Sequence, residues 1–131
     1  MYDTNFLLEK IKNYEKYQEN FMNQMKLELG GCFQKFLDDF PTVEAIQWTQ
    51  YTPYFNDGDQ CIFGVHNLYI KFKNEDDFVS SWDREKDENI FDQISFFRNQ
   101  IPDEVMADVF GDHVQVTISR EDIQIDGYEH D

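Results

Sequence analysis

The sequence predicts one α+β domain over residues 1–131, with a sheet of about four mainly antiparallel strands and helices packed on one face. Two patterns indicate this class. Apolar residues recur at helical spacing before residue 41 and again between 90 and 110. The segments 43–72 and 114–125 are instead rich in β-branched and aromatic residues or alternate in polarity. The expected order is two helices, two strands, two helices and two strands.

The first helix is predicted over residues 4–28, because one face carries apolar side chains at three-to-four spacing. These side chains are Leu7, Ile11, Tyr14, Phe21 and Met25. Gly30-Gly31 is expected to end or bend this helix, and a second helical segment is expected over 33–40. A helix of this length can be a coiled-coil partner. Packing of residues 1–29 on the sheet of the same chain is favoured, since the stripe covers only about three heptads.

Two strands are predicted over 43–51 and 61–72, joined by a loop over 52–60. Hairpin loops ordinarily have about two to five residues, so this longer loop does more than reverse the chain. Gly58 is expected to adopt a positive φ, and Pro53 to fix one turn.

The segment 74–92 holds eight acids and two bases, and we expect it to be a surface connection with short helical pieces. Its apolar anchors are expected to be Phe78, Val79 and Trp82. Two further helices are predicted over 90–101 and 103–110, the first closed by a proline and the second by a glycine.

The carboxy-terminal segment alternates between apolar and polar residues, which predicts an antiparallel hairpin. Placing Ile118 opposite Ile125 keeps both on one face and also aligns His113 with His130. Two cross-strand imidazoles beside Asp131 could bind a divalent transition metal. A solvated histidine pair is the favoured interpretation.

The formal net charge of −16 lies entirely in residues 38–131, because residues 1–37 hold five acids and five lysines. An acidic body argues against direct binding to nucleic acid or to an anionic membrane, since each phosphate contact needs Lys or Arg. The charge is compatible with a protein partner that has a basic surface, with imitation of nucleic-acid charge, or with solubility alone.

The sequence also indicates a cellular compartment. No apolar stretch approaches the roughly 20 residues of a membrane span, and the amino terminus lacks a basic segment before an apolar run. Cys32 and Cys61 stand in unlike contexts and do not form a disulfide framework. We therefore expect a cytoplasmic protein with reduced thiols and no membrane partner.

Patterns for catalysis or metal binding are weak. Asp57 and Asp59 could share a hard cation, but the segment lacks the spacing of a calcium loop, and an Asx-turn explains both residues. Cys61 and His66 would point to opposite faces of one strand, so they do not form a nucleophile–base pair. An enzyme is the weaker expectation, and no cofactor is predicted.

The loop is better explained as an aromatic and acidic binding surface, because Tyr and Trp anchor many protein interfaces. The predicted binding residues are Trp48, Gln50, Tyr51, Tyr54, Phe55, Asn56, Asp57 and Asp59. The competing interpretation is that Tyr54 and Phe55 fold under the loop and cap the end of the sheet. The sequence does not decide between the two.

Two stretches, WTQYTPYFNDGDQCIF at 48–63 and ISREDIQIDGYEHD at 118–131, resemble a family of small bacteriophage and bacterial proteins. The likeness runs from about residue 33 to residue 131. Glu121-Asp122 departs from the usual Asp-Gly turn, and Gly127 stands where Glu is common. The resemblance implies a phage or prokaryotic setting and no particular activity. The matching positions are Trp48, Gln50, Tyr51, Pro53, Tyr54, Phe55, Asn56, Asp57, Gly58, Asp59, Cys61, Tyr128, His130 and Asp131.

We therefore expect a non-enzymatic acidic binding protein, such as a phage accessory factor. Its partner would be a host or phage protein, for example a defence protein that it inhibits or redirects. A homodimer is compatible with this function. The alternative is a small metal-dependent enzyme or nucleotide-binding protein that uses Asp57, Asp59 and the tail residues Tyr128, His130 and Asp131.

Overall fold

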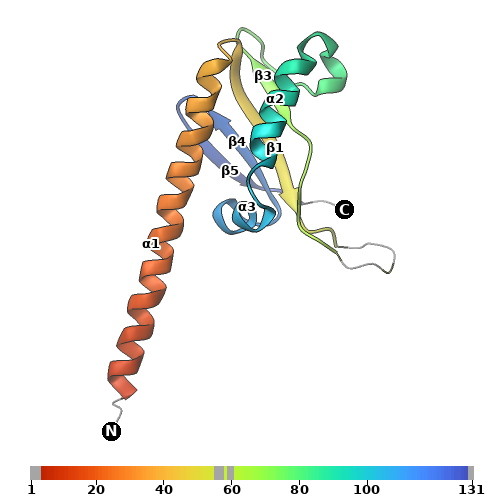
Figure 1. Cartoon of the computed structure of the whole chain (residues 1–131). Coiled ribbons are helices and arrows are strands. Elements are labelled where there is room, and N and C mark those ends of the chain that lie inside the picture. Colours follow the sequence, from red (N-terminus) through yellow and green to blue (C-terminus); the bar gives the residue numbers. More distant parts are fainter. Residues whose placement is uncertain (1–3, 55–57, 59–60, 130–131) are drawn as a thin grey trace.

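The computed structural model describes residues 4–54, 58 and 61–129 (Figure 1). Within these residues the chain forms three α-helices and a five-stranded, mostly antiparallel sheet against which the helices pack. The α+β class predicted from the sequence is confirmed. In Figure 1 the helices cover one face of the sheet, and the first helix extends far beyond it.

The sheet is built around its first strand. Strand β1 (Val43–Tyr51) pairs with β4 (Val114–Ser119) on one side, and β4 pairs with β5 (Ile123–Gly127). On its other side β1 pairs with β2 (Gly64–Val65) at one end and with β3 (Tyr69–Phe72) at the other. Every pairing among the described strands is antiparallel; β1 pairs directly with β2, β3 and β4, and β5 joins the sheet through β4.

The single strand predicted over 61–72 is in fact two strands, β2 and β3. His66 N still donates to Thr49 O of β1 at 2.8 Å, but His66 O accepts from the side chain of Arg98, Nη1, at 2.8 Å. A carbonyl bound by a guanidinium leaves the ladder, so the pairing pauses before β3.

The helices also differ from the prediction at the amino terminus. Helix α1 is continuous from Thr4 to Phe36 and leads into the 3-10 helix η1 (Leu37–Asp39), so Gly30-Gly31 does not break it. Gly costs a helix about 1 kcal/mol relative to Ala, a cost that a long helix with packed neighbours tolerates. Helices α2 (Glu88–Asn99) and α3 (Asp103–Phe110) lie close to their predicted positions.

Only the second half of α1 packs on the body. Residues 4–21 are exposed, whereas Met22 and the residues after it begin to be covered, and Gly30 and Phe33 are buried. The expected packing of residues 1–29 on the sheet is therefore wrong for most of that range. The helix is longer than the sheet face that it crosses, and its first half projects as an arm (Figure 1).

The core lies between the helices and one face of the sheet. Trp48 of β1 is fully buried, with ring centroids 5.3 Å from Phe33 of α1 and 6.0 Å from Phe110 of α3. Phe97 of α2 meets Phe33 edge to face at 5.1 Å. Aromatic side chains from three helices thus converge on one strand. The opposite face of the sheet is polar, as in the hydrogen bond from Gln47 Nε2 to Thr117 Oγ1 at 3.0 Å.

The carboxy-terminal hairpin forms in a register that differs from the predicted one. Ile118 faces Ile123, and Val116 faces Ile125. Ser119 tightens the turn, since its N donates to Asp122 O at 2.9 Å and its Oγ accepts from Asp122 N at 3.0 Å. A shift of two residues keeps the same side chains on the core face, so alternation alone did not distinguish the two registers.

The two adjacent glycines of α1 provide a matched test of the packing. A Cβ at Gly30 would overlap Ile123 Cδ1, whereas a Cβ at Gly31 meets nothing within 4 Å. We expect Gly31→Ala to raise the free energy of unfolding by about 0.5–1 kcal/mol through helix propensity. Gly30→Ala should lower it by about 1–2 kcal/mol, since overpacking outweighs the same gain. Chemical denaturation of both variants measures the difference, and equal stabilisation by both would contradict the close contact between α1 and β5.

Candidate functional site

Two of the predicted binding residues belong to the core. Trp48 and Gln50 are fully buried. Gln50 Oε1 accepts from Trp48 Nε1 at 3.0 Å, and Gln50 Nε2 donates to Met106 O at 2.9 Å and Gly111 O at 2.7 Å. This amide is completely used in joining β1 to α3. The prediction that Trp48 and Gln50 contact a partner is therefore wrong, because neither side chain reaches the surface.

The ring of Tyr51, at the end of β1, lies in a cluster of aromatic and imidazole rings. Its centroid is 4.0 Å from His66 in a stacked arrangement and 5.7 Å from Tyr128. Burial, together with the nearby Tyr128 hydroxyl, raises the pKa of Tyr51 above its ordinary value. Tyr54 stacks on His113 at 4.6 Å yet remains 69% exposed. Of the predicted aromatic residues that the structure describes, Tyr54 alone is open to a partner.

Asp112 anchors the start of the loop to the body. Its Oδ1 accepts from Thr52 N at 2.8 Å and from His113 N at 2.8 Å, and its Oδ2 accepts from Thr52 Oγ1 at 2.7 Å. Partial burial alone would raise the pKa of Asp112, but these hydrogen bonds and the charge of His113 hold it below the ordinary value. His113 adopts a positive φ of 55°, which this bonding supports. Gly58 has a φ of 88°, which confirms its predicted role.

Several of the predicted loop and metal-binding residues lie outside the part of the chain that the structure describes. Phe55, Asn56, Asp57, Asp59, His130 and Asp131 lie outside the described residues. The register that predicted the alignment of His113 with His130 is wrong, since Val114 pairs with Gly127 and His113 O accepts from Tyr128 N at 2.8 Å; His130 itself lies outside the described residues. Among residues 4–54, 58 and 61–129, His, Cys, Asp and Glu side chains do not gather in groups of three that could hold a metal ion.

A second surface, which the sequence did not predict, surrounds Trp82. This residue was expected to anchor the segment 74–92 but is 91% exposed. It lies in the 3-10 helix η2 (Ser81–Asp83), which is followed by η3 (Glu85–Asp87), so the predicted short helical pieces are confirmed. Beside it a pocket of about 260 Å³ opens between η2 and α2, with Leu68 and Phe91 among its lining residues.

Arg84, two residues after Trp82, packs against the core. Its guanidinium lies over the Phe72 ring, 4.7 Å from the centroid, and pairs with Glu75 and Asp87. The hydrogen bond and charge of Arg84 lower the pKa of Glu75. Because Arg84 can bury its stem and keep its charge paired, it covers Phe72 and leaves the neighbouring indole in solvent.

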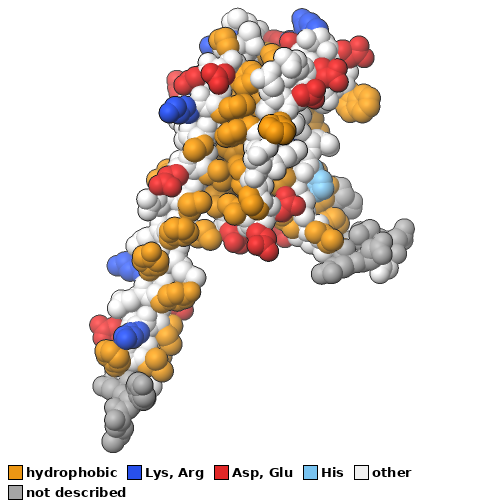
Figure 2. All heavy atoms as spheres, in the orientation of Figure 1, with side chains coloured by type: hydrophobic (Ala, Val, Ile, Leu, Met, Phe, Trp, Pro, Cys, Tyr) orange, Lys and Arg blue, Asp and Glu red, His pale blue; other side chains and the backbone are white. Residues whose placement is uncertain are grey.

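Acidic residues flank this exposed indole in the sequence, and Asp92 lines the same pocket. Figure 2 shows acidic side chains gathered at the end of the molecule where η2 and η3 lie. The exposed acids of this region are Asp76, Asp77, Asp83, Glu85, Glu88 and Asp92. We call Trp82 together with these six acids the Trp82 patch. Its acidic composition was visible in the sequence, but the outward position of Trp82 depends on Arg84.

Comparisons of the chain with protein-family models, with curated proteins and with solved structures found no match. Within the described residues, no helix combines the length and apolar composition needed to cross a membrane.

The hydrogen bonds of Asp112 predict a stability that depends on pH. Because its pKa is lower in the folded chain than in the unfolded chain, the carboxylate stabilises the fold above its ordinary pKa, and this contribution is lost as the pH falls through the folded value. Asp112→Ala should lower the free energy of unfolding by about 1 kcal/mol at neutral pH. It should also flatten the decline between about pH 5 and 2. Glu121→Ala, in the β4–β5 turn, is the control. If the stability of Asp112→Ala declined as steeply with falling pH as that of the unmodified chain, the stabilising role of the Asp112 carboxylate would be contradicted.

Proposed function

We propose that this chain is a non-enzymatic binding protein that holds a basic protein partner through the Trp82 patch. The observation that carries the proposal is the position of Trp82, which is 91% exposed on a surface of carboxylates. Exposing a whole indole to water is unfavourable by a few kcal/mol relative to burying it. A folded chain retains such a residue at a stability cost, and burial against a partner recovers that free energy.

The patch is ordered before it meets a partner. Val79 N donates to Ile70 O at 2.9 Å, and Ser80 Oγ lies 3.1 Å from Asp83 Oδ2. Arg84 then ties η2 to Glu75 and to η3. Because these contacts hold the backbone around Trp82, binding costs less conformational entropy than it would on a free loop. Tryptophan held in this way is a frequent centre of interface binding energy.

The surrounding charge selects the partner. All six acids of the Trp82 patch are exposed, and the nearby Arg84 is already paired within the chain. A basic protein surface gains attraction and a faster approach from this arrangement, whereas nucleic acid and anionic lipid are repelled. Where the partner's basic surface ordinarily binds nucleic acid, the row of carboxylates would act by imitating phosphate charge.

The family resemblance of the loop and tail suggests the biological setting. In a bacterium infected by a phage, the proposed partner is a host protein, and the chain would inhibit or redirect it as an accessory factor. Occupying the basic surface of a defence protein is the simplest form of this activity, because it needs no catalytic group.

Variants at two exposed aromatic residues distinguish binding through the Trp82 patch from binding through the loop over 52–60 that the sequence predicted. The partner is captured from bacterial lysate, identified and purified, and its affinity is then measured for Trp82→Ala and Tyr54→Ala. We expect Trp82→Ala to weaken binding by at least about 30-fold, the effect of losing about 2 kcal/mol. Tyr54→Ala should change affinity less than about threefold. Thermal unfolding should be unaltered in Trp82→Ala, since the side chain is almost wholly exposed.

The same complex tests the role of charge. Its affinity should fall steeply as salt is raised, because exposed charges are screened within about 8 Å at physiological ionic strength. Asp76→Asn with Asp77→Asn should reduce that dependence while leaving Trp82 in place. An affinity that is independent of salt would contradict a basic partner. If Tyr54→Ala abolished binding and Trp82→Ala did not, the binding site would be the loop and not the Trp82 patch.

A further inference from the structure

We propose that α1 pairs with α1 of a second copy of this chain as an antiparallel two-helix coiled coil. The starting observation is the projecting arm. Residues 4–21 are exposed, yet they carry Leu7, Ile11, Tyr14 and Phe21, each about half exposed. A monomer rarely keeps a continuous apolar stripe in water. This inference concerns the arm and is independent of the Trp82 patch.

The stripe follows the heptad spacing of a coiled coil. Apolar and uncharged residues occupy successive steps of four, three, four, three and four residues, which alternate the two core positions of the repeat. In order, these residues are Leu7, Ile11, Tyr14, Gln18, Phe21 and Met25. Leu8 and Met22 extend one edge of the stripe. This edge lies toward the body, because Met22 begins the covered part of α1.

One antiparallel register aligns every core position. If Leu7 faces Met25 of the second copy, then Ile11 faces Phe21 and Tyr14 faces Gln18. The polar residues therefore meet each other in the centre, with apolar layers on both sides. Within one chain Gln18 Nε2 already donates to Tyr14 Oη at 2.9 Å, so the same groups can exchange hydrogen bonds across the pair. A polar layer of this kind fixes register and orientation.

Charge and shape select the antiparallel orientation. Residues 38–131 carry the whole net charge of −16, whereas the first 37 residues are neutral. A parallel pair would bring the two acidic bodies together, and the antiparallel pair places them at opposite ends. In a parallel pair, Lys10 of one copy would face Glu15 of the other and form an exposed ion pair. Such surface pairs contribute little, and the repulsion of two whole bodies outweighs them.

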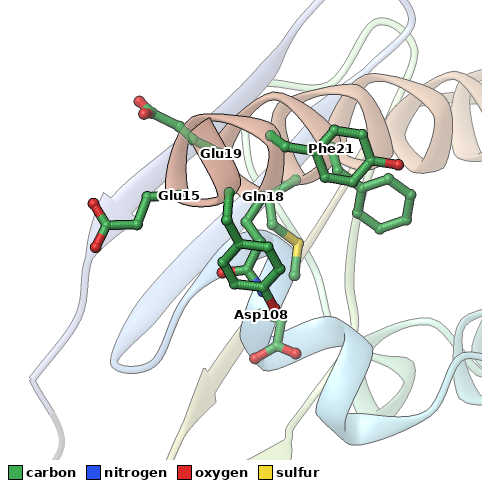
Figure 3. Close-up of a pocket in the computed structure, with 8 residues that line it drawn as sticks. Glu15, Gln18, Glu19, Phe21 and Asp108 are labelled. Atoms are coloured by element: carbon green, nitrogen blue, oxygen red, sulfur yellow. The ribbon is translucent and has the colours of Figure 1, made fainter. Parts of the chain in front are cut away.

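The notch between the arm and the body supplies the second contact. A pocket of about 670 Å³ is lined by seven residues between positions 14 and 22 of α1, with Tyr14, Gln18 and Phe21 among them, and by Asp108 of α3. Figure 3 shows Gln18 pointing from α1 toward Asp108, whereas Glu15 and Glu19 project to one side, away from Asp108. In the proposed register this acidic notch faces residues 10–18 of the second copy. That segment contains three lysines, Lys10, Lys12 and Lys16.

The area that the stripe can bury agrees with a reversible pair. A fully buried aromatic side chain removes about 150–250 Å² from water, and Leu7, Ile11, Tyr14 and Phe21 are about half exposed. These four side chains therefore offer roughly 400 Å² on each chain, and Gln18 and Met25 of the stripe and Asp108 of the notch add to this area. Stable protein interfaces bury roughly 800 Å² on each partner. The pair is expected to form and dissociate reversibly.

Sedimentation across a concentration series tests the pair with matched variants. We expect the unmodified chain to form dimers, and Ile11→Glu to weaken them at least about 100-fold, because the change occurs twice in each dimer. Leu27→Glu makes the same change on an exposed residue away from the stripe and should leave the dimer intact. Ile11 lies in the exposed arm, so near-ultraviolet circular dichroism of the body should be unchanged.

The exposed native thiol of Cys32 reports the orientation. Spin labels are placed there in a Cys61→Ala background. In the antiparallel register the two labels are 32 residues apart along the helix pair, or about 48 Å at 1.5 Å per residue. In a parallel pair they would be about 10 Å apart.

The proposal is overturned if the chain is a monomer at every soluble concentration, or if Leu27→Glu weakens the dimer as much as Ile11→Glu does. A distance of about 10 Å between the Cys32 labels would also overturn it. These outcomes are distinguishable from failure of the proposed function. Dimerisation should persist or strengthen as salt rises and should be indifferent to Trp82→Ala. Binding of a basic partner should weaken with salt and be lost in that variant.

Discussion

The buried amide of Gln50 is the interaction on which the arrangement of this molecule depends. It accepts from the indole of Trp48 and donates to two carbonyls, Met106 O within α3 and Gly111 O just after its last residue. A buried amide left without these partners would cost several kcal/mol. The position of α3 on the sheet is therefore closely specified. The chain leaving α3 then places Asp112 and His113 where they hold the start of the loop.

The fold separates two kinds of surface. The body carries the acidic charge, with an exposed indole near η2, and the arm carries a neutral helix with an apolar stripe. Each surface suits a different force, since screened Coulomb attraction acts at one and burial of apolar area at the other. Under the two proposals, one chain would engage a basic partner and a second copy through different surfaces.

Much of the fold was predictable because its signals are local. The ends of β1 and α3 follow from apolar spacing and from the residues that flank them. The failures involve contacts between distant residues. The split of 61–72 depends on Arg98, which lies 32 positions away from His66. The hairpin register depends on Ser119, and the exposure of Trp82 depends on Arg84 covering Phe72. Residues Trp48 and Gln50 matched an interface composition but serve the core, because composition does not reveal which face of a strand is covered.

Because α1 is continuous through Gly30, the projecting arm moves as a rigid extension of the part of the helix that packs on the body. Its attachment is the close packing of Gly30 against Ile123 of β5, and the helix remains unbroken from there to Thr4. That length is about 39 Å at 1.5 Å per residue. A rotation of about 10° at this fulcrum would carry the tip by roughly 7 Å, so a small rearrangement of the β5 edge becomes a large displacement of whatever the arm holds.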